Sequence, residues 1–219
     1  MSLKESYLRL KQQIPEHVTL VAVSKTKPIE DIKVLYDLGH RDFGENKVQE
    51  MCDKAEVLPK DIRWHMIGHV QTNKIKQMSD FVHLIHGIDK GKRLKEVQKR
   101  AKAANRKQNV LLQVKIADED TKFGMTLQQA KEILSDDNIA QYPNVNIVGL
   151  MGMATFTEDT HQVRDEFKAL KELYEELKTE FPQINYLSMG MTADYEIAID
   201  EGSNMVRIGS AIFGERSYH

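Results

Sequence analysis

One lysine stands where an apolar run of residues stops. Leu20–Val23 is rich in apolar and β-branched residues, and Lys25 follows it after a single serine, so its stem would emerge from packed surroundings. Burial disfavours an ammonium ion, and a neutral amine is what condensation with an aldehyde requires. The simpler interpretation is a lysine at a strand end that extends its amine to water. Position alone favours the simpler interpretation.

Asn46 and several histidines follow other short apolar runs. Asn46 could donate to a ligand oxygen, although asparagine at such a position more often caps the helix that follows. His65 and His69 have a spacing that suits a metal on a helix, but the residues around them indicate a strand, where this spacing separates the side chains too far. His83 and His86 are expected on opposite faces of a strand. We therefore expect no metal site.

Two glycine-containing turns late in the sequence have the composition of a phosphate cradle. Their candidate donors are Ser188 and Thr192 in the first turn and Gly209 and Ser210 in the second. Glycine lets backbone N–H groups approach an anion closely, and parallel barrels often hold phosphate in the loops after strands seven and eight. Asp194 argues against an anion there unless its side chain faces away. Ordinary turn and cap chemistry is the alternative.

Two charged segments give no sign of a function. Residues 90–107 are strongly basic and contain no aromatic residue, so base stacking is not supported and a solvated helix face is expected. The basic residues in question are Lys92, Arg93, Lys95, Lys99, Arg100 and Lys102. The three acids at 118–120 resemble a cation site in composition only.

The composition is that of a soluble globular protein without a strong net charge. The chain carries 31 Lys and Arg against 33 Asp and Glu, for a net charge of −2, so no global field favours nucleic acid or an anionic membrane. It has neither a membrane-spanning apolar run nor a signal-peptide pattern at Met1–Glu5. Because Cys52 is the only cysteine, an intramolecular disulfide and a cysteine zinc site are excluded. We expect a cytoplasmic protein.

Short apolar runs alternate with segments of helical periodicity along the whole chain. Their near-continuous apolar character is typical of parallel strands that are covered on both faces. The eight candidate strands are Leu20–Val23, Arg41–Phe43, Ile62–Ile67, Phe81–Ile85, Val110–Ile116, Val145–Leu150, Ile184–Leu187 and Met205–Ile208.

The intervening segments predict helices. A helix over about residues 3–13 precedes the first strand, Pro28 opens the next helix and Gly39 closes it. Thr126 and Gln129 form a capping box, and apolar residues spaced by three and four predict a long helix over 163–181.

The alternation of strands and helices predicts a single-domain (β/α)8 TIM barrel over residues 1–219, with an extra N-terminal helix. An open doubly wound sheet is the alternative. In a barrel the C-terminal strand ends converge on one opening, the mouth, where Lys25 and the two glycine turns would meet.

Taken together, six segments resemble one known family. They are VAVSKTKP at Lys25, FGENKVQE at Asn46, WHMIGHVQTNK at His65, LMGMAT at Met151, SMGMTADYEIAI at Ser188 and MVRIGSAIFGER at Arg207. In order and spacing they look like the pyridoxal phosphate homeostasis family of small proteins that bind pyridoxal 5'-phosphate (PLP). The resemblance covers nearly the whole chain, about residues 3–216.

The resemblance implies a barrel like the N-terminal domain of alanine racemase (fold type III), with PLP bound covalently to Lys25 as an aldimine. It implies further cofactor-binding residues around the phosphate, the ring and the ring nitrogen, with His69 as a possible neighbour only. These residues are Asn46, Ser188, Met191, Thr192, Arg207, Gly209 and Ser210.

The same resemblance implies binding rather than catalysis. An arginine at the ring nitrogen is always charged and cannot accept the proton that makes the ring a good electron sink. Alanine racemases work with such an arginine, but they add a second domain with a tyrosine base, and this sequence has no residues for one before it ends at His219. We therefore expect a protein that carries and buffers PLP in vitamin B6 homeostasis, with PLP-dependent apoenzymes as recipients. We expect a monomer, because no predicted helix shows a surplus apolar face.

Three other functions stay open at this point. A racemase or another PLP enzyme is the main alternative. A barrel enzyme that uses Lys25 on sugar phosphates is permitted by the lysine and the turns alone. Nucleic-acid binding through residues 90–107 is disfavoured by the near-zero net charge.

Overall fold

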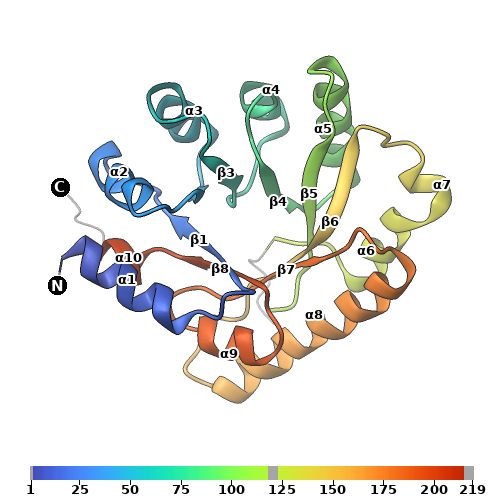
Figure 1. Cartoon of the computed structure of the whole chain (residues 1–219). Coiled ribbons are helices and arrows are strands. Elements are labelled where there is room, and N and C mark those ends of the chain that lie inside the picture. Colours follow the sequence, from blue (N-terminus) through green and yellow to red (C-terminus); the bar gives the residue numbers. More distant parts are fainter. Residues whose placement is uncertain (1, 118–122, 215–219) are drawn as a thin grey trace.

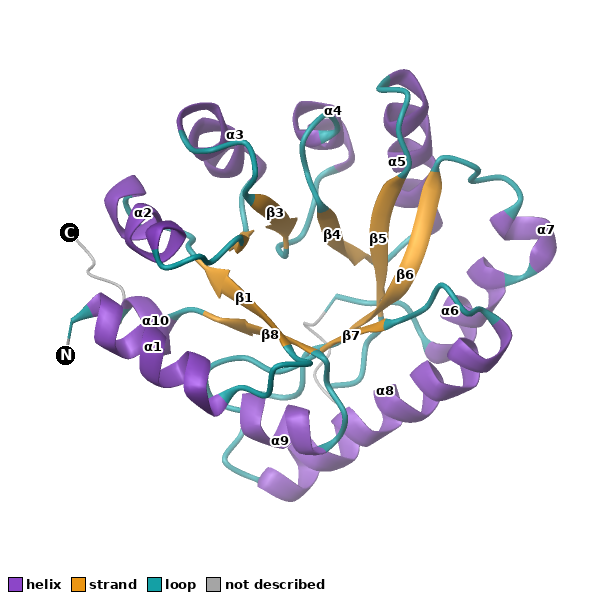
Figure 2. Ribbon diagram, viewed as in Figure 1, coloured by secondary structure: helices purple, strands orange, loops and turns teal. Residues whose placement is uncertain are grey.

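The computed structural model describes residues 2–117 and 123–214, so the acidic segment at 118–120 lies outside the described residues. Eight parallel strands follow one another around a closed barrel, and the last strand pairs with the first. Helices surround the strands on the outside (Figures 1 and 2). The predicted (β/α)8 barrel is confirmed, and the open sheet is wrong because four residue pairs, from Thr19 with Met205 to Ala22 with Ile208, close the ring.

The eight strands are β1 (Thr19–Val23), β2 (Asp42–Glu45), β3 (Arg63–Met66), β4 (Leu84–Ile88), β5 (Gln108–Gln113), β6 (Val145–Met151), β7 (Tyr186–Ser188) and β8 (Met205–Ile208). The described helices are α1 (Leu3–Gln13), α2 (Ile29–Asp37), α3 (Val48–Val57), η1 (Thr72–Lys74), α4 (Ile75–Met78), α5 (Gly91–Ala103), α6 (Leu127–Leu134), α7 (Asp136–Ile139), α8 (Thr160–Glu180), α9 (Tyr195–Asp200) and α10 (Ser210–Phe213).

The fourth and fifth strands differ most from the sequence prediction, by three residues at a boundary. The sequence places the fourth strand at 81–85, but β4 begins at Leu84. The backbone N–H groups of Phe81 and Val82 bond to the carbonyl of Met78, so these apolar residues finish the preceding helix. The fifth strand is predicted to reach Ile116, whereas β5 ends at Gln113 and Val114 makes an isolated bridge.

The structure confirms the predicted signals that begin and end two helices. Pro28 is the N-cap of α2, and Gly39, with φ +90°, follows its C-terminus. Glycine suits that position because a side chain is strained in the left-handed region. The capping box of Thr126 and Gln129 is present on α6.

The apolar residues pack in two layers. The larger layer lies between the barrel and its helices, where α8 buries the predicted stripe from Val163 to Leu177. The smaller layer comprises Val21, Leu84, Leu111, Val148, Met151 and Met205. Because these residues alternate with outward-facing neighbours on their strands and contact one another, they fill the barrel interior.

The N-terminal helix α1 lies between the helices that flank it in the ring. It contacts α2 and α10, and Tyr7 and Leu10 are buried on its inner face. The two ends of the described chain therefore lie on the same side of the molecule (Figure 1). None of the described helices has the length and apolar character that crossing a membrane requires.

Candidate cofactor site at the barrel mouth

The eight predicted site residues come from four neighbouring strands. Asn46 follows β2, Lys25 follows β1, Arg207, Gly209 and Ser210 end or follow β8, and Ser188, Met191 and Thr192 end or follow β7. The ring order β7–β8–β1–β2 makes these four strands consecutive, and we call them the site strands. The C-terminal ends of parallel strands share one edge, so the fold gathers residues from both ends of the sequence at one side of the mouth.

Lys25 lies on a turn whose two flanking peptides are held by ions. The side chain of Lys25 is half-buried and Thr26 has φ +63°, a strained value for a β-branched residue. Nζ of Lys54 donates to the carbonyl of Ser24 at 2.8 Å, and the N–H of Thr26 donates to Oε1 of Glu50 at 2.5 Å. The peptides before and after Lys25 are therefore both fixed.

The ions that hold this turn form a network from β2 and α3. Lys54 donates to Glu45 at 2.8 Å and to Glu50 at 2.7 Å, and Ser24 donates its hydroxyl to Glu45 at 2.6 Å. Glu45 and Lys54 are buried. Burial raises the pKa of Glu45, while Lys54 opposes the rise. We call Glu45, Glu50 and Lys54 the lysine clamp.

The lysine clamp is not apparent from the sequence. A signal is present, since Glu50 and Lys54 have the i,i+4 spacing of a helical ion pair. That spacing usually marks a solvated helix face, and nothing in the sequence shows that this face of α3 packs under the end of β1. Asn46 also differs from its alternative interpretation, because the N-cap of α3 is Lys47 and no side chain caps the helix.

Arg207 is a buried cation inside the barrel. Its guanidinium donates to Oγ of Ser188 at 2.6 Å and to the carbonyl of Gly152 at 3.1 Å. Among the side chains that the structure describes, Arg207 has no ion-pair partner. Burial lowers its pKa to about 10, with Asp194 opposing, so the side chain keeps its charge at neutral pH. A desolvated charge without an adjacent anion favours an electron-rich ligand atom beside it.

Ser188 lies beneath the mouth rather than on it. Its exposed fraction is 0%, and its hydroxyl contacts both Arg207 and Nδ1 of His86. The sequence suggests Ser188 as a direct phosphate donor. Because its hydroxyl is committed to these two side chains, the structure ties Ser188 to the position of Arg207.

The turn after β7 directs the carboxylate of Asp194 toward the backbone. Oδ1 of Asp194 accepts the N–H of Met191 at 2.6 Å. The turn needs Gly190, whose φ is +98° and where an added Cβ would lie 2.7 Å from Cβ of Ala198. Met191 is exposed and Thr192 is half-buried beside it. The repulsion that Asp194 would exert on an anion is thus reduced, since this oxygen is engaged within the turn.

A second glycine brings the end of β8 against the end of β1. A Cβ on Gly209 would lie 3.2 Å from the carbonyl oxygen of Val23, which is tighter than ordinary contact. The close approach places Ser210, which is exposed, on the same edge as Lys25. On the other side of β1 in the ring, Gly68 after β3 lets the backbone of Asn46 after β2 approach closely. A Cβ on Gly68 would overlap the Asn46 carbonyl.

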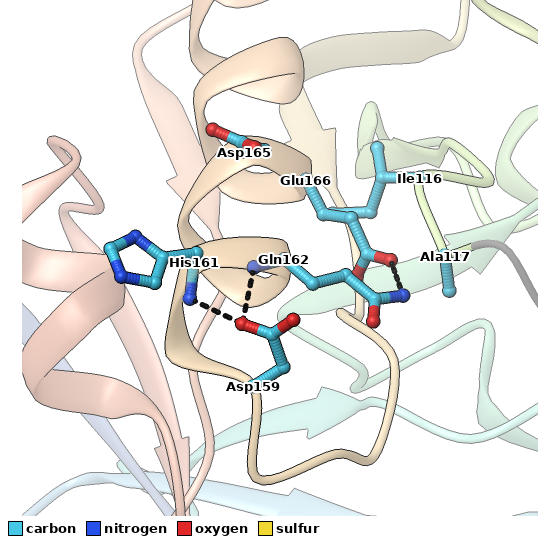
Figure 3. A pocket seen from close by; sticks show the side chains of 7 residues that line it. All are labelled: Ile116, Ala117, Asp159, His161, Gln162, Asp165 and Glu166. Carbon is cyan, nitrogen blue, oxygen red and sulfur yellow. Dashed lines mark hydrogen bonds between the residues drawn. The ribbon is translucent and has the colours of Figure 1, made fainter.

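A cavity of about 600 Å³ opens beside the mouth, between the residues after β5 and the start of α8 (Figure 3). Its lining residues are Ile116, Ala117, Asp159, His161, Gln162, Asp165 and Glu166. Glu166 accepts the N–H of Thr155 at 2.6 Å and its hydroxyl at 2.7 Å, which fixes the end of the LMGMAT segment where the chain leaves β6. None of the predicted cofactor residues lines this cavity.

The histidines are arranged differently from the sequence prediction. His65 lies inside the barrel and His69 lies beyond the end of β3. His83 and His86 do not separate onto opposite faces of one strand, because His83 precedes β4 and both rings lie against the His65 ring at 5.5 and 5.2 Å. Over the described ranges, no group of three or more His, Cys, Asp or Glu side chains could hold a metal ion.

The basic helix contains one exception to the predicted solvated face. Arg93 is buried, donates to the carbonyl of Val70 at 2.6 Å and pairs with Asp89. Its helical period places position 93 on the buried face of α5, together with Leu94 and Val97. The exposed cations, as expected for a solvated face, are Lys92, Lys95, Lys99 and Lys102.

Comparison with known proteins defines the class first. The chain belongs to the family described as "Alanine racemase, N-terminal domain", whose family model matches residues 1–217. The structure of PipY from Synechococcus elongatus, without PLP, aligns with a TM-score of 0.90 and 32% identity over 97% of this chain and 100% of that chain. The PLP-bound PipY structure aligns with a TM-score of 0.87 and 31% identity over the same shares.

Curated relatives define the group more narrowly. The pyridoxal phosphate homeostasis protein of Aquifex aeolicus is 42% identical over 91% of this chain and 87% of its own length. The protein of the same name from Escherichia coli K12 is 38% identical over 93% and 88%. The chain belongs to the pyridoxal phosphate homeostasis protein family, as the sequence motifs predict.

Proposed function

We propose that this protein binds PLP at the barrel mouth and holds it through a Schiff base to Nζ of Lys25. The observation that carries the proposal is a half-buried lysine on a fixed turn, next in the ring to a buried arginine without an adjacent anion. The PLP-bound PipY structure and the names of the curated relatives support it. The cofactor supplies an aldehyde for an amine and a phosphate for a cradle of donors.

The donor set on the site strands fits such a ligand. Arg207 would face an electron-rich ring atom, and the backbone at Gly209 with the hydroxyls of Thr192 and Ser210 would bind the phosphate. Met191 and Asn46 would lie near the ring. The two glycines support this assignment, because a Cβ at Gly209 would crowd Val23 and a Cβ at Gly190 would crowd Ala198, so a side chain there would disturb the turns that carry these groups.

We propose further that the protein carries PLP without strong turnover. Arg207 cannot accept a proton at neutral pH, because even in its buried position its pKa is about 10. A guanidinium that stays charged can only donate to the ring nitrogen, so it favours the unprotonated ring. An unprotonated ring is a poor sink for a carbanion's electrons. The expected roles are therefore binding, buffering and delivery to PLP-dependent apoenzymes, by a cytoplasmic monomer.

A visible spectrum before and after borohydride tests the binding proposal. The protein isolated with PLP should show a visible band that borohydride removes, leaving a stable adduct on Lys25. Lys25→Ala should lose the band and the adduct. The matched control is Lys27→Ala in the same segment, where Nζ of Lys27 instead contacts the carbonyl of Phe213. A reducible adduct that persists in folded Lys25→Ala would refute the lysine assignment.

Incubation of the loaded protein with single L-amino acids in D₂O tests the absence of turnover. The carrier proposal expects exchange of the α-proton no faster than with free PLP. Exchange at rates typical of enzymes would show that the protein is a racemase or a related enzyme. Size-exclusion chromatography with light scattering checks that the protein is a monomer. Direct delivery is checked by the rate of PLP transfer to an apoenzyme, which should exceed the rate at which PLP dissociates from the carrier alone.

A further inference from the structure

A line of polar side chains crosses the interior of the barrel. It runs through Asp42, His65, His86, Ser188 and Arg207, and we call these five residues the interior chain. The successive contacts are 3.0 Å between Asp42 Oδ1 and His65 Nε2, 2.9 Å between the two histidines, 3.1 Å from His86 to Ser188 and 2.6 Å from Ser188 to Arg207. Asp42 begins β2, and Arg207 lies near the end of β8.

This arrangement is unusual for a barrel interior, which branched apolar side chains normally fill. The four inner members of the chain, from His65 to Arg207, are at most 4% exposed, so each polar atom has lost its water. Polar groups buried in this way cost stability unless every partner is present. Their presence beneath the mouth therefore calls for a role beyond packing.

The two ends of the interior chain fix the direction of every hydrogen bond. Arg207 can only donate. The Asp42 carboxylate can only accept: burial would raise its pKa, but bonds from Arg63 and His65 outweigh burial and hold it well below the usual range. With neutral imidazoles a single order remains. Arg207 donates to Ser188, Ser188 to Nδ1 of His86, Nε2 of His86 to His65, and His65 to Asp42.

The neutral state of His86 agrees with its surroundings. Burial lowers the pKa of His86 well below 6.5, and the cationic forms of its neighbours His65 and Arg207 act in the same direction. Other charged or titratable groups near the interior chain are Arg63 at the carboxylate of Asp42, His40 at its carbonyl, His83 at the His65 ring, and Asp194 near Arg207. A uniform series of donors strengthens each member by polarisation.

We infer that the interior chain is a positioning device for Arg207. The acceptor on His86 turns the Ser188 hydroxyl away from the guanidinium, so that a lone pair of Oγ receives Nη1 of Arg207. The carbonyl of Gly152 receives Nη2, and the remaining N–H groups are then directed by the planar fork of the side chain. The inference rests on the proposed function, since the ligand to which Arg207 is presented is the PLP ring.

Replacement of His86 tests this inference with PLP itself as the probe. His86→Leu removes the acceptor for Ser188, and we expect PLP to bind about tenfold more weakly, the factor for one lost hydrogen bond to a charged group. We also expect the pH midpoint of the visible band of the remaining bound PLP to shift. His86→Asn, which can offer an acceptor near the position of Nδ1, should restore most of both properties.

A matched control and a double-mutant cycle separate positioning from packing. His83→Leu changes a histidine that touches the His65 ring from outside the interior chain, and it should leave affinity and midpoint unchanged. In a Ser188→Ala background, His86→Leu should have no further effect on either property. Additive effects, or a normal midpoint and affinity in His86→Leu, would overturn the inference.

The outcomes also distinguish this inference from the proposed function. Wild-type protein that forms no reducible PLP adduct refutes the proposed function, whereas normal wild-type binding with an unaffected His86→Leu refutes the positioning role alone. If His86→Leu does not fold, the folded His86→Asn and Asp42→Asn variants decide. Asp42→Asn should then shift the midpoint while His86→Asn should not, and an unchanged midpoint in Asp42→Asn would overturn the inference.

Discussion

At the scale of single residues, the geometry of the mouth depends on charged side chains that bond to the peptides around Lys25. Lys54 donates to the carbonyl of the peptide before Lys25, and Glu50 accepts the N–H of the peptide after it. Oε2 of Glu45 is buried without a hydrogen-bond partner among the residues that the structure describes, so this carboxylate depends on Lys54 and Ser24 through its other oxygen. A network that is satisfied on one side only is sensitive to the loss of either ion.

Lys54→Met should show this sensitivity. Removing one partner of a buried ion pair typically costs about 3–5 kcal/mol, and we expect a loss of that size in the free energy of unfolding at pH 7. PLP binding should weaken as well, because the turn that carries Lys25 is released. Urea unfolding followed by circular dichroism measures the loss. Lys60→Met is the control, since exposed Lys60 contacts carbonyls at the end of α3.

The loss in Lys54→Met should shrink as the pH falls. Burial already raises the pKa of Glu45 above its ordinary value of 4.5, and removal of Lys54 raises it further. A folded state with a raised carboxyl pKa binds the proton more tightly than the unfolded chain, so lowering the pH favours folding. A difference between variant and wild type that stays constant from pH 7 to pH 5 would contradict this account.

His40 gives a pH dependence of opposite sign. It accepts the hydroxyl of Tyr7 at 3.2 Å and donates to the carbonyl of Asp42 at 2.8 Å, both as a neutral ring. Burial lowers its pKa from 6.5 to about 4, so the unfolded chain takes up the proton first as the pH falls. Between pH 7 and pH 5 this should remove about 2 kcal/mol from the free energy of unfolding.

Unfolding titrations at the two pH values check the role of His40. His40→Gln should have a flatter dependence on pH, even though its stability at pH 7 is lower. His17→Gln, which changes an exposed histidine, should retain the wild-type dependence. An unchanged slope in His40→Gln would assign the dependence to another group.

At the scale of elements, glycines decide how closely strand ends and turns approach. Gly190 and Gly39 both have a left-handed backbone, with φ +98° and +90°, but their surroundings differ. A Cβ at Gly190 would lie 2.7 Å from that of Ala198, whereas a Cβ at Gly39 would meet nothing within 4 Å. The pair therefore separates backbone strain from a steric clash.

Alanine substitutions at these two glycines should differ in size. Gly39→Ala should cost about 1 kcal/mol, the ordinary penalty for a side chain in the left-handed region. Gly190→Ala adds the clash with α9, and about 3 kcal/mol or more is expected because well-packed sites resist overpacking. Thermal unfolding measures both, and only Gly190→Ala should also weaken PLP binding. Equal losses would show that the turn after β7 moves freely.

The elements are predictable from the sequence where their signals are local. The capping box at Thr126, the glycine stop at Gly39 and the stripe on α8 all depend on residues within one helix. The predicted fourth strand starts too early because Phe81 and Val82 have the apolar character of strand residues. Their backbone N–H groups nevertheless bond to the carbonyl of Met78 in the preceding helix. Apolar character alone does not reveal which backbone partner a residue takes.

The sequence suggests which residues belong to the candidate site, but it does not reveal which side chains they contact. Motifs identify Lys25 and Arg207 because they lie in distinctive segments. They do not reveal that Ser188 faces inward, because its environment depends on His86, which is distant in the sequence. The lysine clamp and the interior chain are both interactions between elements. Their charged residues resemble ordinary solvated side chains until the fold brings them together.

At the scale of the whole molecule, the site exists only when the ring is closed. Lys25 comes from the first strand and Arg207 from the last, and the β1–β8 pairing is what joins them. A ligand held across this junction binds the folded barrel and not the unfolded chain. Loss of the ligand and loss of the fold are therefore linked.

Urea unfolding of the PLP-loaded protein should show one transition by two observables. The visible band of bound PLP and the far-ultraviolet circular dichroism should be lost together, as expected for a cooperative single barrel. Free PLP at a hundredfold excess over its dissociation constant should add about 2.7 kcal/mol to the free energy of unfolding. Loss of the band well before the circular dichroism would show that β1 and β8 separate while the rest of the barrel persists.

The contact between α1 and α10 would permit a circular permutation of this chain. Because both ends of the described backbone meet there, a short linker could join Gly214 to Ser2 and new termini could be cut into the turn between β3 and η1. Such a circular permutant would keep every strand neighbour. It would turn the β1–β8 junction into a covalently continuous unit of strand, two helices and strand, in which the arginine and the lysine are specified by one stretch of gene.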